Sequence, residues 1–233
     1  MEDAKMNRYE TYDIEGINEV MENADPEDFG SSAAFLSTFV IDASGSMWEF
    51  ENDMRDCLVA YKEAIAGSKQ ADEMLLSKIL FSDYITVGGF VAPENFDPSY
   101  RTDDMTKLFD AIVEAKDRMF EYSDQLRDNG VTVRGCVVIF TDGLDNMSHN
   151  TEATTRQAIK DLQNREFIVA MISFGDNAKN IGQRLGIRDK NIMEVNNDPH
   201  ALREAIALAS KSAVSASKKA STGAAGDGGF FEV

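Results

Sequence analysis

Three oxygen-bearing side chains stand at alternate positions directly after the first strongly apolar run of the chain. They are Asp42, Ser44 and Ser46, in the segment FVIDASGSMW. Within one turn they can converge on a single point, and carboxylate and hydroxyl oxygens suit Mg²⁺, Mn²⁺ or Ca²⁺ rather than a soft metal. Gly45 suits a tight turn because glycine adopts positive φ freely. Alone, D-x-S-x-S arises by chance in about one chain in twenty of this length.

Two further residues could contribute oxygen ligands. Asp142 follows the apolar run CVVIF, where a parallel strand is expected to end and to present a carboxylate to a ligand. Its Asp-Gly pair is also typical of a plain turn. Thr106 opens the helical segment TKLFDAIVEA, where an isolated threonine is most simply an N-cap. Asp145 could add a second acidic residue near the ion or belong to a solvated turn.

Other familiar chemistries lack their motifs. His149 and His200 have no zinc-ligand spacing with a cysteine or with each other. The chain has no G-x-S-x-G elbow, no P-loop and no strand-associated G-x-G-x-x-G. The glycine cluster at 223–229 follows the last expected helix, so it cannot cradle a phosphate at a helix start and is predicted to be flexible.

Strand-length apolar runs alternate with helical periods along most of the chain. The runs are TFVI (38–41), LLSKILF (75–81), CVVIF (136–140), FIVAMISF (167–174) and the weaker NIMEV (191–195). YITVGGF (84–90) could form a hairpin with the second run. The expected helices cover 54–65, 108–126, 152–164, 178–185 and 199–216. This order predicts a doubly wound α/β fold, with a mostly parallel sheet, helices on both faces, and a ligand site at the carboxyl ends of the strands.

Charge and cysteine content narrow the class of protein. The 233 residues carry 23 basic and 41 acidic side chains, a net charge of −18. Such a surface repels phosphate backbones and anionic lipid, so we expect neither nucleic-acid nor membrane binding. No apolar run approaches the roughly 20 residues of a membrane span, and no secretory signal is visible. The chain has only two cysteines, Cys57 and Cys136, each within an apolar segment. We therefore expect reduced thiols, no disulfide framework and a cytoplasmic location.

The two ends differ in composition from the middle. Residues 1–30 hold ten acids and two bases, and are predicted to be an acidic leader, either solvated or containing a short helix built on Ile14, Ile17, Val20 and Met21. Residues 31–212 are predicted to form the folded domain. Residues 213–233 turn to Ala, Ser, Lys and Gly, which predicts a flexible tail.

Taken together, the order of these elements resembles the von Willebrand factor type A (VWA) domain family over about residues 34–210. The resemblance implies that five side chains form that family's metal-ion-dependent adhesion site: Asp42, Ser44, Ser46, Thr106 and Asp142. One segment departs from the family, because Asp103-Asp104-Met105 precedes Thr106 where Gly-Gly is common. This loop is therefore expected to be stiffer and more acidic.

The resemblance also implies a function. A divalent cation, Mg²⁺ with Mn²⁺ or Ca²⁺ as alternatives, would keep one position for an Asp or Glu carboxylate of a partner protein. The expected protein is thus a metal-dependent recognition module, an intracellular adaptor or regulatory subunit of a larger complex, and not an enzyme. The alternative is a metal-dependent hydrolase or phosphotransfer enzyme that uses the cation as a Lewis acid, although no general base or second metal cluster can be assigned. A third possibility is a passive scaffold with a vestigial site.

Two smaller features leave alternatives open. Trp48 follows the predicted site and could anchor a partner from the surface or pack onto the core. A carboxylate of the acidic leader, or the C-terminal Glu232, could occupy the metal site of its own or a neighbouring molecule.

Overall fold

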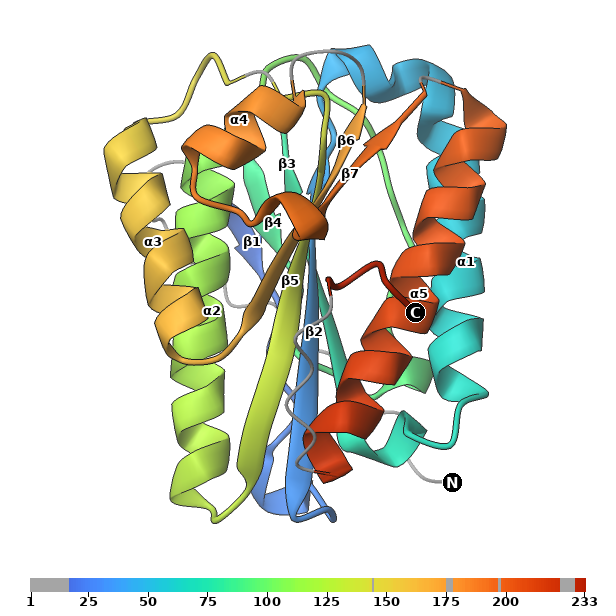
Figure 1. The fold of residues 1–233 in the computed structure, drawn as a ribbon, viewed down its shortest axis with the longest axis vertical. Helices are drawn as coiled ribbons and strands as arrows, with labels where there is room; N and C mark the ends of the chain where they lie inside the picture. Colours follow the sequence, from blue (N-terminus) through green and yellow to red (C-terminus); the bar gives the residue numbers. More distant parts are fainter. Residues whose placement is uncertain (1–16, 144, 175–177, 197, 223–228) are drawn as a thin grey trace.

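A mostly parallel sheet forms the centre of the computed structural model (Figure 1). The structure describes residues 17–143, 145–174, 178–196, 198–222 and 229–233. Seven strands among these residues form one sheet, in the order β1-β4-β3-β2-β5-β6-β7. The strands are β1 (Ile17–Val20), β2 (Ala33–Asp42), β3 (Met74–Phe81), β4 (Ile85–Val87), β5 (Thr132–Thr141), β6 (Ile168–Phe174) and β7 (Ile192–Val195). Only β3 and β4 pair antiparallel, as the predicted hairpin requires, so β1 and β4 run opposite to the other five.

Helices cover both faces of the sheet, which confirms the predicted α/β fold class (Figure 1). The helices are α1 (Glu51–Ala66), α2 (Leu108–Asp128), α3 (Glu152–Asn164), α4 (Ala178–Arg184) and α5 (Pro199–Thr222). On one face α1 and α5 lie side by side, and on the other α2 and α3 do so. Short 3₁₀ turns occupy Pro26–Asp28, Gly45–Phe50, Ala71–Glu73, Pro93–Asn95 and Asp189–Asn191.

The two faces of the central strands supply two separate apolar cores. In β2, Leu36 and Val40 pack on the side of α2, whereas Phe39 and Ile41 pack on the side of α1 and α5. Burial on both faces is the reason that these strands read as continuous apolar runs. The buried faces of α1 and α2 consist of the residues whose spacing predicted those helices.

The parallel strands β2, β3 and β5 have their carboxyl ends side by side at the same end of the sheet, which we call the carboxyl edge. Asp42, the last residue of β2, pairs with Phe81 at the end of β3, and Ile41 pairs with Phe140 near the end of β5. Loops that leave this edge therefore start close to one another. In open α/β sheets, ligands bind among the loops at the carboxyl ends of the strands.

The structure differs from the sequence predictions at the N-terminal end. Ile17–Val20 is a strand paired with β4, neither a helix nor a solvated leader. After β1 the chain remains hydrogen-bonded to the end of β4 and the segment that follows it. The Met21 amide donates to the Val87 carbonyl (2.9 Å), and the Ala24 amide donates to the Phe90 carbonyl (2.7 Å). The free edge of β4 offers hydrogen-bond partners that local spacing cannot reveal. Ile14, a part of the predicted helix, lies outside the described residues.

At the C-terminal end, the predicted flexible tail is wrong for residues 213–222, because α5 continues to Thr222. Small side chains such as Ala213 and Ser217 are buried on this helix, and Phe230 beyond it is buried too. Alanine is the strongest helix former, so an alanine-rich stretch can extend a helix that finds a surface to pack on. Residues 223–228 lie outside the described residues.

No helix among the described residues is both long and apolar enough to cross a membrane.

Candidate metal centre

Four of the five predicted ligands meet at the carboxyl edge through hydrogen bonds. The Ser44 amide donates to Asp42 Oδ1 (2.9 Å), and the Ser44 and Ser46 hydroxyl oxygens lie 3.0 Å apart. The Ser46 hydroxyl donates to Asp142 Oδ2 (2.7 Å), which joins the loop after β2 to the loop after β5. The cluster consists only of carboxylate and hydroxyl oxygens, the donor set that hard divalent cations prefer.

Asp42 lies at the buried base of this cluster. Its Oδ2 accepts a hydrogen bond from the Thr141 hydroxyl (2.8 Å), whose oxygen accepts one from the Gly143 amide (3.0 Å). Burial raises the pKa of Asp42 from 3.8 to about 6, and the nearby charge of Asp142 adds to this, while hydrogen bonds from Ser44 and Thr141 oppose it. A buried carboxylate in this state would gain from a cation beside it. The role of Thr141 was missed, although the Thr-Asp-Gly segment contained the signal.

Thr106 lies beside the loop that follows Asp142. Its amide donates to Asn146 Oδ1 (3.0 Å), and its carbonyl accepts from the Asn146 and Met147 amides (both 3.2 Å). Thr106 is buried. The N-cap prediction was wrong, because Lys107 holds the N-cap position of α2.

Asp145 stabilises the start of α2. Its carboxylate accepts hydrogen bonds from the Phe109 amide (3.2 Å) and the Ser148 hydroxyl (2.6 Å). Amide groups in the first turn of a helix lack internal partners, and here a loop 36 residues away supplies one. Sequence spacing alone could not connect these two segments.

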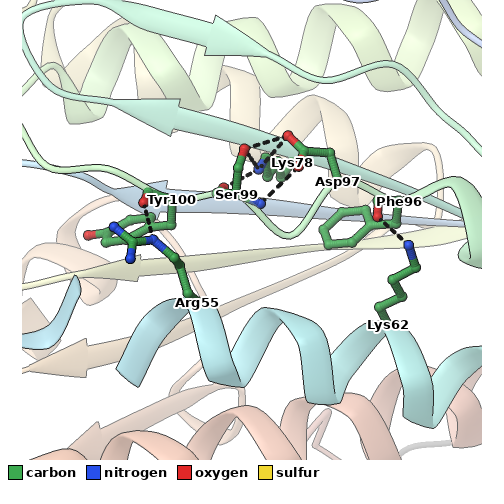
Figure 2. Close-up of polar contacts among 7 residues, drawn as sticks. All are labelled: Arg55, Lys62, Lys78, Phe96, Asp97, Ser99 and Tyr100. Atoms are coloured by element: carbon green, nitrogen blue, oxygen red, sulfur yellow. Dashed lines mark hydrogen bonds and ion pairs between the residues drawn. The ribbon is translucent and has the colours of Figure 1, made fainter. Parts of the chain in front are cut away.

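The segment from Phe96 to Met105, here called the strap, leads into Thr106 and is held by basic side chains that the sequence did not single out (Figure 2). From α1, Arg55 Nε donates to the Tyr100 carbonyl (3.0 Å) and Lys62 Nζ to the Phe96 carbonyl (2.9 Å). From β3, Lys78 Nζ contacts Asp97 Oδ2 (3.2 Å). The strap is thereby fixed at three points, two from α1 and one from β3.

The far end of the strap is bonded to the candidate site itself. The Tyr100 hydroxyl donates to the carbonyl of Asp42 (2.6 Å). The Asp103 amide donates to the Ala43 carbonyl (2.7 Å), and the Gly45 amide donates to the Asp104 carbonyl (3.3 Å). The strap is thus bonded to the Asp42–Ser46 turn, and its acidic residues contribute through backbone groups.

Lys78 is the buried anchor of the strap, and its replacement by methionine is expected to loosen the segment. Besides Asp97, its ammonium donates to the Ser99 hydroxyl (3.1 Å) and to the Ser99 carbonyl. Burial lowers the Lys78 pKa, and the charge of Asp97 opposes this shift. A methionine side chain at this position would fill similar space without these bonds, at a cost of about 1–3 kcal/mol in unfolding free energy. Amides of the strap should then exchange hydrogen faster, as measured by mass spectrometry.

The matched control for this prediction is Lys69→Met, because Lys69 is exposed. If Lys78→Met leaves both urea unfolding and exchange within the strap like those of Lys69→Met, the anchoring role is refuted.

The candidate metal ligands include hydroxyl groups as well as carboxylates. No three His, Cys, Asp or Glu side chains gather as a metal site among the described residues. The candidate donors are instead two carboxylates and neighbouring hydroxyls, with one carboxylate whose ionisation is disfavoured by burial. The residues present therefore fit a hard divalent cation.

Comparison with known proteins gives a fold and no close relative. No protein-family model and no curated protein matches the chain. The pilus adhesin SpaC of Lactobacillus rhamnosus GG matches with a TM-score of 0.65 at 11% identity, over 78% of this chain and 30% of that one. PTMP1 from the mussel byssus, with zinc in its metal-ion-dependent adhesion site (MIDAS), matches with a TM-score of 0.58 at 16% identity, over 78% and 46% of the chains. The von Willebrand factor domain of the pilus tip protein Mfa5 from Porphyromonas gingivalis matches with a TM-score of 0.58 at 9% identity, over 84% and 98%.

The extent of these matches differs between the proteins. The chain spans less than half the length of SpaC and PTMP1, but nearly all of the Mfa5 domain. At such low identities the likeness concerns the fold alone. The chain described here has the von Willebrand factor type A fold.

Proposed function

We propose that this chain is a metal-dependent protein-recognition module. The five residues that would hold the cation are Asp42, Ser44, Ser46, Thr106 and Asp142. The observation that carries the proposal is the hydrogen-bonded cluster of hydroxyl and carboxylate oxygens at the carboxyl edge. Support also comes from PTMP1, which shares the fold and holds zinc in a MIDAS motif. For this chain Mg²⁺ is proposed, with Mn²⁺ or Ca²⁺ as alternatives.

The bound ion would supply positive charge at an edge where the chain itself is acidic, and so attract a carboxylate from a partner protein. Ser44 and Ser46 contribute neutral oxygens, so the negative charge at the site stays low. Asp42 orients the Ser44 amide and the Thr141 hydroxyl, which fixes the turn in which the serines stand. This arrangement would allow a protein with a net charge of −18 to recognise an acidic residue.

Recognition is better supported than hydrolysis. A hydrolase would need a general base near the cation, and because the sequence assigns none, Asp145 or Asp104 would have to serve by default. Asp145 already accepts two hydrogen bonds at the start of α2. We therefore propose a non-enzymatic adaptor or regulatory subunit. An intracellular location is proposed with it, supported by the acidic surface and by the two buried free cysteines, Cys57 and Cys136.

Affinity capture from a native lysate tests the proposal. Wild type and Asp42→Ala are run in parallel, each with Mg²⁺ and with EDTA, and circular dichroism confirms that each variant is folded. Partners are expected only with wild type and metal. Asp56→Ala, which removes an exposed carboxylate of α1, is the matched control and should behave like wild type. The same partners in every lane would refute metal-dependent recognition, and turnover of p-nitrophenyl phosphate or acetate would favour an enzyme.

A further inference from the structure

Exposed apolar side chains gather around the candidate metal centre. Among the described residues, the large apolar side chains with the greatest exposure are Trp48 (67%), Val233 (57%), Tyr84 (48%), Met147 (44%), Met105 (41%) and Val59 (39%). Four of these six stand on loops at the carboxyl edge. We call this set, Trp48, Tyr84, Met105 and Met147, the apolar rim.

The four loops of the rim are joined by hydrogen bonds. The Met105 amide donates to Asp83 Oδ1 (2.6 Å), which places Met105 beside the turn that holds Tyr84. The Met147 amide donates to the carbonyl of Thr106 (3.2 Å), the residue after Met105. The segments that hold Tyr84, Met105 and Met147 are therefore hydrogen-bonded neighbours.

The rim also reaches the serine turn of the candidate site. The Gly45 amide donates to the Asp104 carbonyl (3.3 Å), next to Met105. Trp48 follows Ser46 by two residues, in the 3₁₀ turn Gly45–Phe50. Members of the rim thus flank both the serine turn and Thr106, which belong to the proposed set of ligands.

Trp48 is exposed although the turn that carries it packs against the core. Met47 and Phe50 in the same turn are buried, so the turn packs on the core and still leaves the indole in solvent. Such exposed patches mark interaction sites, and tryptophan is enriched among the residues that dominate binding energy. Methionine side chains adapt to partners of varied shape. Of the two alternatives for Trp48, packing and partner contact, the exposure favours contact.

The charge around the rim indicates what kind of partner fits. On the same loops the exposed acidic side chains outnumber the exposed Lys and Arg side chains, since Glu49, Asp103 and Asp104 stand against Arg101, and Asp83 and Asp145 are partly exposed as well. A uniformly acidic partner would be repelled there, even with a cation at the centre. Charge complementarity thus requires basic side chains at the periphery of the contact.

We propose that the apolar rim docks a loop of a basic partner protein. One carboxylate of that loop goes to the metal, the apolar residues beside it pack on Trp48, Met105 and Met147, and its outer Lys or Arg side chains face the surrounding aspartates. The proposal rests on the metal-dependent recognition proposed above and adds the nature of the partner.

A displayed library of seven-residue loops, with Asp fixed at the centre and the other positions random, tests this inference without a known partner. Selection against wild type in Mg²⁺ is expected to enrich apolar residues beside the Asp and Lys or Arg farther out. The selected loops should bind Trp48→Ala about tenfold more weakly, and Trp48→Phe should recover much of the loss. Val59→Ser, which removes an exposed valine in the middle of α1 and outside the rim, is the matched control and should bind like wild type.

The outcomes separate this inference from the function on which it rests. If metal-dependent loops are selected but show no apolar or basic preference, or bind Trp48→Ala as well as wild type, the rim proposal is overturned and the metal function stands. If every selected loop binds equally in EDTA, both are overturned. Because Trp48 is exposed, its variants are expected to fold, and circular dichroism checks this.

Discussion

Replacing Asp42 by asparagine is expected to stabilise the metal-free protein while removing its affinity for divalent cations. The Asp42 carboxylate is fully buried, and burial raises its pKa from 3.8 to about 6. The ionised form is thus disfavoured in the fold, and asparagine carries no charge that burial could penalise. Loss of the carboxylate should weaken Mg²⁺ binding by about 100-fold or more.

The pH dependence of this effect follows from the direction of the shift. A pKa that is higher in the fold than in the unfolded chain gives stability that is fully present below pH 3.8 and is lost as the pH rises through about 6. At pH 7.5 the ionised Asp42 costs up to about 3 kcal/mol in the metal-free protein. The Thr141 hydroxyl would lose its acceptor in the variant, so a net gain of about 1–2 kcal/mol is expected.

Urea unfolding in EDTA from pH 5 to 8, followed by circular dichroism, measures this difference. The advantage of Asp42→Asn should grow with pH and shrink toward pH 5. Calorimetric titration with Mg²⁺ measures the loss of affinity. A variant that is less stable than wild type throughout this range, or that binds Mg²⁺ normally, would contradict this account of Asp42.

Replacing Gly135 by alanine is expected to cause a large loss of stability. Gly135 of β5 pairs with Leu36 of β2, and a Cβ atom there would lie 2.4 Å from the Leu36 carbonyl oxygen and 3.0 Å from Met119 Cε. The first of these neighbours is backbone, so the two central strands would have to shift. Overpacking of this kind costs about 3 kcal/mol in unfolding free energy.

Gly30→Ala is the matched control, because its Cβ would meet nothing within 4 Å. It should be neutral or more stable by about 0.5 kcal/mol, through a lower entropy of the unfolded chain. Guanidinium unfolding of both variants gives the comparison. Because β2 and β5 lead to Asp42 and Asp142, Gly135→Ala should weaken Mg²⁺ binding as well. Equal stability of the two variants would show that the strands yield more easily than the packing implies.

The central part of the fold could be predicted from the sequence because burial on both faces leaves a strong local signal. The runs at 38–41 and 136–140 lie within β2 and β5, and the spacing of Met54, Leu58 and Tyr61 gives the buried face of α1. Strand β1 has no such signal. INEV at 17–20 becomes a strand only because β4, more than 60 residues away, offers an unpaired edge.

The part of the candidate site that stands at strand ends could also be predicted from the sequence. Asp42 and Asp142 stand at strand ends, where the topology of the sheet brings them together whatever the loops do. The capping of α2 by Asp145 and the anchoring of the strap by Lys78 join segments distant in sequence, and no local pattern reports such bonds. The metal ligands themselves remain a prediction that the geometry supports.

A crystal structure of the protein grown with MnCl₂, with anomalous differences measured at the manganese edge, tests the central claim most directly. The account predicts one strong peak at the carboxyl edge, within coordination distance of the Ser44 and Ser46 hydroxyls, with Asp142 bound directly or through water. No peak at this place, or manganese found only elsewhere on the acidic surface, would contradict it.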